Sequence, residues 1–343
     1  MKKMLNTLYV MTEDAYAGLN SECVEINYSD GTRKAVPLHT LEHIVLFSYK
    51  GASPALMGKC ESLGITIAFY SPQGKYLAMT GVNARGNVLL RREQYRISEH
   101  ENESLRYARN FMIGKLYNSK SQIHRIIRDH PMQINADKLR DTASSLDLYM
   151  NRILESADMA TLRGIEGKAA AEYFSVYNEF ILQRKDTFYF SERNRKPPLD
   201  PINALLSFAY TLLANDCANA LTSVGLDAYS GFYHTDRPGR KSLALDLMEE
   251  LRVVIAERVV LFMINNRVFD SSDFIKQESG AVLLTDEARK AFISKWQAKK
   301  REEIVHPFLK EKIMWGLVPY AQALLLARSI RGVLDEYPPF FWR

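Results

Sequence analysis

The sequence has little of what marks secreted and membrane proteins. Three scattered cysteines, Cys23, Cys60 and Cys217, occur among 343 residues, and none forms a C-x-x-C pair. An odd count of this kind argues against a disulfide framework and fits a reducing compartment, so we expect a cytoplasmic protein. Glu13 and Asp14 interrupt the start before an apolar segment develops, which predicts no signal peptide. No run of about 18 apolar residues occurs, so we expect no membrane span.

The composition is that of a globular protein with a mild excess of positive charge. Hydrophobic residues make up 47% and charged residues 25%, enough to bury a substantial core. The net charge of +5 permits a nucleic-acid partner without requiring one. The length suggests about two domains.

Residues 1–88 predict a small, β-rich, β-sandwich-like domain with one helix. Short runs rich in β-branched and aromatic residues predict its strands: LNTLYVM, ECVEINYS, RKAVPL, HIVLFS, ITIAFY and KYLAMT. The helix is predicted to start at Ser53-Pro54 and to end at Gly64, because proline suits the first turn and glycine suits the C-terminal cap.

The second part of the chain predicts an all-α domain. We place a linker at residues 89–97 and the helical domain at 98–343, so the predicted fold class is α+β with two domains. Strand signals become sparse after the linker, and a 3.6-residue hydrophobic period takes over. The predicted helical segments are 98–130, 136–157, 160–190, 200–224, 242–266, 285–303 and 307–333.

The stretch GFYHTDRPGRKSLALDLMEELR, residues 231–252, carries the clearest chemical pattern. His234 lies in a loop before a helix for which Ser242 is the expected N-cap. Asp246, Glu249 and Glu250 share one face of that helix. A divalent metal with His234 as a nitrogen ligand would offset their mutual repulsion. The alternative is a solvated acidic face beside a surface histidine.

A second acidic position, Glu166, is flanked by Gly164 and Gly167 in LRGIEGKAAAEYF. Each glycine inside a helix costs roughly 0.8–1 kcal/mol relative to alanine, so both need a reason. One reason is the close approach of a phosphate or another helix to a site that contains Glu166. The other is a tight helix crossing near a helix start, where a glutamate is favoured by the macrodipole.

Basic residues lie beside both acidic segments, as expected for a phosphodiester substrate. These candidate DNA-binding residues are Arg163, Arg237, Arg240 and Lys241. A cationic cluster at Lys299–Arg301 is instead ordinary chemistry for the end of a helix.

Together these motifs resemble the CRISPR-associated Cas-one integrase family. The resemblance rests on LRGIEGKAAAEYF, NALLSFAYTLLAN, VGLDAYSGFYHTDRPGRKSLALDLMEELR and the terminal PPFFWR, and on GASPALMGKCESLGITIAFYSPQG and GNVLLRREQYR in the first part. It covers nearly the whole chain and looks closest to the subtype I-C branch.

The resemblance implies a site and a set of partners. The metal ligands of the family fall on Glu166, His234 and Glu249, with Asp246 as an acidic neighbour near the metal. Many relatives carry aspartate in place of Glu249, which leaves open whether Glu249 binds directly or through water and whether Asp246 shares the role. The implied activity is insertion of short foreign DNA into the CRISPR array, together with metal-dependent cleavage of branched DNA. The implied assembly is a homodimer, paired through the N-terminal domain, that joins a bridging Cas-two dimer and in subtype I-C often a Cas-four nuclease.

The expected mechanism is attack by a DNA 3′-hydroxyl on a phosphodiester, assisted by Mg²⁺ or Mn²⁺. Two alternatives stay open: a metal-independent DNA-binding scaffold, and a general repair nuclease for branched DNA.

Three further features receive simpler interpretations. The other histidines are expected at the surface or at helix ends: His39, His43, His100, His124, His130 and His306. Residues 276–285 are expected to form a loop that closes over the site, with its turn at Gly280. The apolar tail 336–343 is expected to dock in a groove of its own chain or of a partner.

Overall fold

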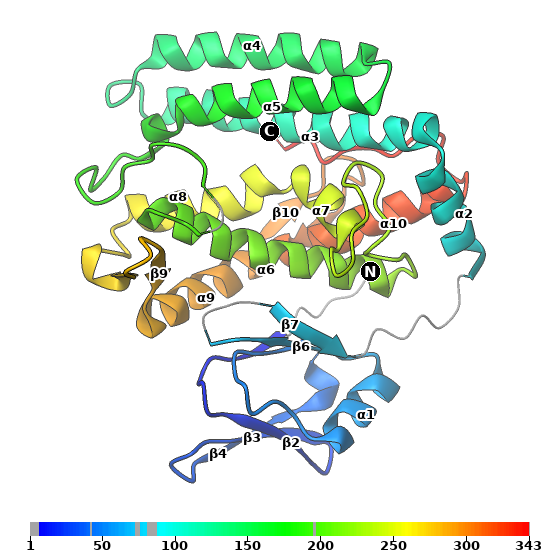
Figure 1. Ribbon diagram of the computed structural model, residues 1–343, viewed down its shortest axis with the longest axis vertical. Coiled ribbons are helices and arrows are strands. Elements are labelled where there is room, and N and C mark those ends of the chain that lie inside the picture. Colours follow the sequence, from blue (N-terminus) through cyan, green and yellow to red (C-terminus); the bar gives the residue numbers. More distant parts are fainter. Residues whose placement is uncertain (1–6, 42, 73–75, 81–87, 195–196, 343) are drawn as a thin grey trace. The chain divides into compact units, whose positions relative to one another are not determined.

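The computed structural model describes residues 7–41, 43–72, 76–80, 88–194 and 197–342. It divides the chain into two compact units, Met1–Arg85 and Gly86–Arg343. The first is rich in strands and the second, larger unit is mostly helical, as the sequence predicts (Figure 1).

Two sheets form the N-terminal unit. β2 (Tyr16–Asn20), β3 (Cys23–Asn27) and β4 (Arg33–Pro37) form an antiparallel sheet. The other sheet has the order β1 (Thr7–Val10), β5 (His43–Leu46), β6 (Thr66–Tyr70) and β7 (Tyr76–Thr80), with only the last pair antiparallel. Side chains from both sheets share one hydrophobic core, as in a sandwich.

The single helix of this unit, α1 (Pro54–Leu63), has the predicted ends. The Ser53 hydroxyl accepts a hydrogen bond from the Leu56 N–H at 3.1 Å, and Pro54 is in the first turn. Gly64 closes the helix at φ +72°, a left-handed conformation that glycine adopts without strain. Strand β2 was missed because Gly18 and Asn20 weaken its strand pattern.

The linker predicted at residues 89–97 is wrong, because these residues lie within helix α2 (Val88–Glu99). Their charged side chains cover the outer face, while Leu90, Gln94 and Ile97 are buried. Gln94 is the polar anchor of this helix: its amide donates to the carbonyls of Asp227 and Ser230 at 2.7 and 2.8 Å. It also accepts from the Asp227 N–H at 2.9 Å, so α2 fixes the segment that leads to His234.

The long helix α3 is the centre of the helical unit. It contacts α4 and α5, and also α7 and the π-helix that follows α7 (Figure 1). Helices α6, α8, α9 and α10 complete the described part of this unit. The helices that follow α2 have these bounds: α3 Glu101–Asp129, α4 Ala136–Glu155, α5 Met159–Ser175, α6 Pro201–Ser223, α7 Ser242–Glu249, the π-helix Arg252–Glu257, α8 Arg258–Asn265, α9 Asp286–Arg301 and α10 Val318–Ile330.

Two predicted helices are too long, and the unit is not all-α. The helix predicted over 160–190 ends at Ser175 and gives way to a 3-10 turn, Tyr177–Phe180. The helix predicted over 307–333 begins only at Val318, because Pro319 has no N–H to donate and fits the first turn. Two small antiparallel pairs were not expected: β8 (Phe274–Lys276) with β9 (Val282–Leu284), and β10 (Glu303–Val305) with β11 (Lys312–Met314).

Among the described residues, no helix is long and apolar enough to cross a membrane.

Candidate active site

The acidic residues of α7 are buried, so the alternative of a solvated acidic face is wrong. Asp246 and Glu250 have no exposed surface, and Glu249 is 2% exposed. They lie inside because α7 packs against α3 and α6. Ser242 is the first residue of the helix and not its N-cap, and its hydroxyl donates to the Thr235 carbonyl at 3.2 Å. A buried acid needs partners, and the three acids find different ones.

Asp246 holds the loop that carries His234. Its Oδ2 accepts from the N–H groups of Phe232 and Tyr233 at 2.7 and 3.0 Å. Its Oδ1 accepts from the His234 N–H at 2.9 Å and lies 2.6 Å from His234 Nδ1. Both carboxylate oxygens of Asp246 thus make hydrogen bonds to the loop. Asp246 is therefore placed behind the histidine as an orienting residue.

Gly231 permits this arrangement. A Cβ at that position would lie 2.7 Å from the Ser242 Cβ and 3.0 Å from Asp246 Oδ2. The loop can close on the start of α7 only because no side chain is present there.

The imidazole of His234 therefore points its second nitrogen toward Glu249. Nδ1 lies 2.6 Å from Asp246 Oδ1, and Nε2, on the opposite side of the ring, lies 3.7 Å from Glu249 Oε1. A carboxylate on one ring nitrogen is the pattern by which proteins orient a metal-binding histidine.

Glu249 is held by two cations. Arg252 Nη2 lies 2.8 Å from its Oε1, and Lys115 Nζ lies 3.0 Å from its Oε2. Burial alone would raise the pKa of Glu249, but Arg252 and then Lys115 outweigh it and lower that pKa to about 2. Oε2 is buried and accepts no aligned hydrogen bond from any described residue, so the contact with Lys115 is an ion pair only.

Glu166, on α5, meets the same lysine. Lys115 Nζ donates to its Oε1, and the Tyr233 hydroxyl donates to its Oε2 at 3.4 Å. The ammonium of Lys115 thus lies between two carboxylates that are 83 positions apart in the sequence. Burial disfavours the charged lysine, but Glu249 and Glu166 outweigh it and raise its pKa.

The two glycines beside Glu166 do not serve a tight helix crossing. A Cβ at Gly164 or Gly167 would meet nothing within 4 Å. Glu166 is also more than a turn into α5, which begins at Met159 after the Asp158 cap. The interpretation as a helix crossing near a helix start is therefore wrong.

These donors match a divalent ion in kind, although they are not assembled around one. Among the described residues, no group of three or more His, Cys, Asp or Glu side chains is arranged to hold a metal. Instead, the cation between Glu166 and Glu249 is the Lys115 ammonium. Two carboxylates, an imidazole and a buried Glu249 oxygen without a hydrogen bond form a donor set that suits Mg²⁺ or Mn²⁺.

The four candidate DNA-binding residues differ in exposure. Arg163 is exposed and near the site, where it donates to the Tyr233 carbonyl at 2.9 Å and lies over the Tyr233 ring. Arg237 is exposed and Arg240 half-buried in the loop before α7. Lys241 is the exception: it donates to Asn215 Oδ1 at 3.3 Å, and burial lowers its pKa to about 8. Lys241 is thus a weaker candidate for a phosphate contact than its neighbours.

Sequence reasoning missed Lys115 and Arg252. Arg252 ends the stretch that was singled out, three positions after Glu249, and starts the π-helix. Single π-turns often accompany functional sites. The signal for Lys115 was a lysine between apolar residues in the middle of a predicted helix, in FMIGKLY. Such a residue either extends to the surface or neutralises a buried acid.

Glu250 has a different task from its neighbours, because it binds the C-terminal tail. It accepts hydrogen bonds from the Tyr337 hydroxyl, from Gln322 Nε2 at 2.9 Å and from the Phe340 N–H at 2.8 Å. Asn118 fastens the tail further, through the Phe340 carbonyl and the Trp342 N–H. The tail therefore docks on its own chain, one of the two predicted arrangements.

Two of the simpler interpretations are corrected. His306 is buried, where its Nε2 lies 3.1 Å from Gln322 Oε1, so it is not a surface histidine. Residues 276–285 are not a plain loop, because they include the β8–β9 hairpin that packs on α6. Gly280 forms its turn at φ +82°, as predicted.

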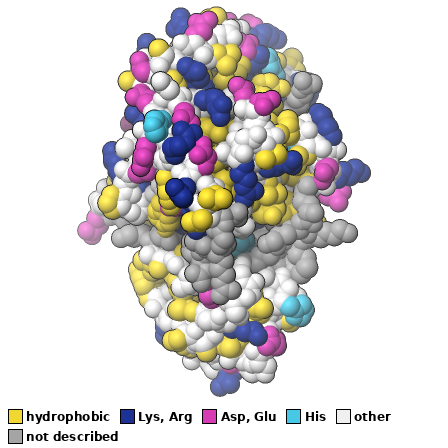
Figure 2. All heavy atoms as spheres, turned by 90° about the vertical axis from the view of Figure 1, so that its right-hand side faces the viewer, with side chains coloured by type: hydrophobic (Ala, Val, Ile, Leu, Met, Phe, Trp, Pro, Cys, Tyr) yellow, Lys and Arg dark blue, Asp and Glu magenta, His cyan; other side chains and the backbone are white. Residues whose placement is uncertain are grey.

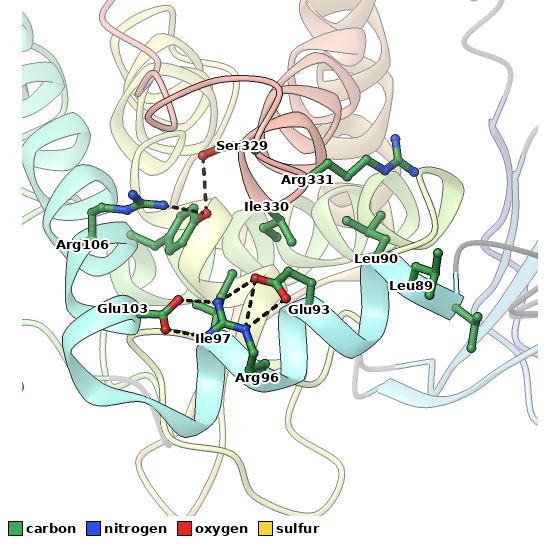
Figure 3. Close-up of a pocket in the computed structure, with 13 residues that line it drawn as sticks. Leu89, Leu90, Glu93, Arg96, Ile97, Glu103, Arg106, Ser329, Ile330 and Arg331 are labelled. Atoms are coloured by element: carbon green, nitrogen blue, oxygen red, sulfur yellow. Dashed lines mark hydrogen bonds and ion pairs between the residues drawn. The ribbon is translucent and has the colours of Figure 1, made fainter.

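A cavity of about 910 Å³ lies away from these residues, between α2, α3 and the end of α10 (Figure 3). Its central cation, Arg96, is neutralised by Glu93 and Glu103 at 2.6 Å each. Figure 2 likewise shows Lys and Arg interspersed with Asp and Glu on one face of the helical unit. Arg106 and Arg331 also line this cavity, which includes none of the residues around Lys115.

The family follows from comparison with known proteins. A family model described as "CRISPR associated protein Cas1" matches residues 8–298. The chain belongs to the Cas1 family. Two Cas1 endonucleases match over the full length of both chains: one from Chlorobaculum tepidum at 45% identity and one from Rhodospirillum rubrum at 46%. The chain is therefore a CRISPR-associated endonuclease and integrase of this family.

Cas1 sequences also occur within a larger protein. A Cas4 exonuclease/Cas1 endonuclease fusion from Geobacter sulfurreducens is 33% identical and matches 98% of this chain and 60% of the fusion.

Solved structures share the fold. A casposase bound to an integration product has a TM-score of 0.85 at 18% identity and covers 99% of this chain and 95% of its own. A Cas1 protein from Thermotoga maritima has a TM-score of 0.80 at 20% identity, covering 95% and 97%. A Cas6-RT-Cas1–Cas2 complex chain has a TM-score of 0.81 at 22% identity and covers 100% of this chain and 36% of that one.

Proposed function

We propose that Glu166, His234 and Glu249 bind one Mg²⁺ or Mn²⁺ and form the catalytic site for cutting and joining DNA strands. One observation carries the proposal. Two acids from helices far apart in sequence, one buried and one half-buried, share a single cation beside an oriented imidazole. Carboxylates are brought together in this way in sites that bind a divalent ion.

Each residue of the chain has a distinct task. Glu166 and Glu249 supply oxygen ligands, and His234 supplies Nε2. Asp246 keeps Nδ1 protonated and directed away from the ion, and so acts near the metal without binding it. Arg252 fixes Oε1 of Glu249 and leaves Oε2 as the oxygen for coordination. When bound, the ion would supply charge neutralisation at the scissile phosphate and lower the pKa of the attacking hydroxyl.

Lys115 competes with the ion for the same two carboxylates. Its ammonium balances Glu166 and Glu249 when no metal is present, so the site does not carry two uncompensated charges. Metal binding must therefore displace the lysine from at least one acid.

The substrate would be DNA, and the nucleophile a DNA 3′-hydroxyl. Short foreign DNA would be inserted into the CRISPR array by its attack on a phosphodiester. Arg163, Arg237 and Arg240 would hold the phosphates on either side, with a smaller part for the half-buried Lys241. The choice of insertion site would come from DNA shape and partners more than from base contacts.

We infer three partners. The likeness to a chain of a Cas1–Cas2 complex supports a bridging Cas2 dimer, and the Cas4/Cas1 fusion relative supports Cas4. A homodimer paired through the N-terminal unit, and the subtype I-C assignment, rest on the resemblance of the motifs.

The test is a branched DNA substrate incubated with Mn²⁺, with and without EDTA. We expect cleavage and joining that EDTA abolishes, and Glu166→Ala, His234→Ala and Glu249→Ala should each abolish both while leaving the protein folded. Glu172→Ala, on the same helix as Glu166 but away from the site, is the matched control. Activity that persists in EDTA, or in any of the three variants, would refute the assignment. DNA binding without any chemistry would favour a scaffold, and cleavage without insertion into a repeat substrate would favour a repair nuclease.

A further inference from the structure

A polar groove lies in the helical unit where the ends of α3, α8 and α9 meet. Two cavities, of about 440 and 400 Å³, share Arg125, Arg258 and Phe262 in their linings and therefore adjoin. Arg125 is ten residues from Lys115 on α3, which places the groove about 15 Å along that helix from the candidate active site.

The groove has an excess of positive charge. Arg258 makes no hydrogen bond or ion pair with any described residue, and Lys295 is exposed and likewise has no acidic partner among them. Arg125 and Lys299 are balanced by Asp129 and Glu302. Burial and then the nearby Arg125 lower the pKa of Arg258 to about 10, although Glu302 and Asp129 act in the opposite direction. An anion bound here would therefore further offset the repulsion between the two arginines.

An aromatic ring and two amides accompany these cations. Phe262 is 53% exposed, although it lies on a helix whose other apolar residues are buried. The side-chain amides of Gln122 and Gln133 line the same cavity, and no described residue hydrogen-bonds to them. Phosphate-binding cations beside an exposed ring and free amides are the features by which proteins bind single-stranded nucleic acid, with bases stacked on the ring.

We propose that this groove binds a single-stranded segment of DNA, with Arg258 on a phosphate and Phe262 stacked on a base. The inference rests on the proposed function only in taking DNA as the polymer. An unpaired strand held here would continue from the duplex or branch that is processed at Glu166 and Glu249. The groove thus extends the DNA contacts beyond Arg163, Arg237 and Arg240.

The test is fluorescence anisotropy with a labelled oligothymidylate of roughly 12 nucleotides. It is carried out in EDTA, so that its result is independent of metal chemistry. Arg258→Ala should weaken binding about fivefold and reduce the slope of log K against log salt by about 0.7, as expected for one lost phosphate contact. Phe262→Ala should weaken binding about tenfold and leave the slope unchanged, whereas Phe262→Trp should bind at least as tightly as the wild type.

Arg301→Ala is the matched control. It removes one exposed cation from the end of α9, outside both cavities, and should change binding less than twofold. Three results would overturn the proposal: Arg258→Ala behaving like Arg301→Ala, Phe262→Leu binding like the wild type, or oligoglutamate displacing the oligothymidylate at equal charge, which would indicate an acidic peptide. The assay measures binding alone and contains EDTA, so a failure of the catalytic assignment would leave this result unaffected.

Discussion

The ammonium of Lys115 lies 3.0 Å from Oε2 of Glu249 and also donates to Glu166. One helix, α3, therefore provides the cation that joins acids from α5 and α7. This relationship explains how the fold holds the two carboxylates close together. It also makes the lysine the residue that distinguishes a metal site from a structural ion pair.

Replacing Lys115 by methionine should tighten metal binding, because the competing cation is removed. We expect the apparent Kd for Mn²⁺, measured by titration with EPR detection, to fall at least several-fold. The metal-free protein should melt several degrees lower, since breaking a buried ion pair costs roughly 3–5 kcal/mol. Lys120→Met, on the same helix and paired with Asp147 at the surface, should change neither quantity appreciably. Unchanged Mn²⁺ affinity in Lys115→Met would indicate that the ion binds elsewhere.

Asp246→Asn tests the orientation of His234. The single amide oxygen can still accept from the N–H groups of Phe232 and Tyr233, but the amide NH2 can neither accept from the His234 N–H nor stabilise a proton on Nδ1. We expect a 10- to 100-fold loss of Mn²⁺ affinity or of cleavage rate, the usual effect of removing a residue that orients a metal ligand. Circular dichroism should show an intact fold. If the variant keeps the Mn²⁺ affinity and the cleavage rate of the wild type, Asp246 only anchors the loop and does not orient His234 for metal binding.

Gly167→Ala separates stability from function on α5. A Cβ there meets nothing within 4 Å, so the alanine should stabilise the helix by roughly 0.8–1 kcal/mol, seen as a higher melting temperature. If this glycine allows a phosphate to approach Glu166 closely, cleavage should fall despite the gain in stability. Full activity in the stabilised variant would remove the remaining functional reason for the glycine.

Glu250 predicts a pH dependence of stability. Burial raises its pKa to about 7, partly offset by hydrogen bonds from Tyr337 and Gln322. The pKa of Glu250 in the folded protein lies above its unfolded value near 4.3. Its contribution to the free energy of unfolding is therefore complete below pH 4.3 and is lost as the pH rises through 7. Metal-free melting temperatures should therefore fall between pH 5 and pH 8, and the decline should be shallower in Glu250→Gln. Parallel curves for the two proteins would contradict this role.

Local patterns predicted local structure well. Ser53, Pro54 and Gly64 placed both ends of α1, since caps depend on neighbouring residues. The charged residues of α2 led to the prediction of a linker. The sequence pattern near α2 could not show otherwise, because Gln94, which anchors that helix, has its hydrogen-bond partners more than 130 positions away. Pro319, which sets the true start of α10, was overlooked inside a longer apolar period.

The site was only partly accessible from the sequence. The residue types at Glu166, His234 and Glu249 suggested metal chemistry, but only the family resemblance connected the two segments. Lys115 lies 51 positions before Glu166 and has no local signature, so its role depends on how α3 packs. Adjacent acids also proved to have unrelated roles: Glu249 faces Lys115, whereas Glu250 binds the tail. The sequence pattern placed Glu249 and Glu250 on one face of a helix and could not distinguish their roles.

The most direct test is a crystal structure of the protein soaked in Mn²⁺, with anomalous scattering used to locate the ion. We predict a peak within coordination distance of Glu166, Glu249 and Nε2 of His234, with the Lys115 ammonium moved away from at least one carboxylate. A fully occupied ion elsewhere, or Lys115 still bridging both acids at saturating Mn²⁺, would contradict the proposed site.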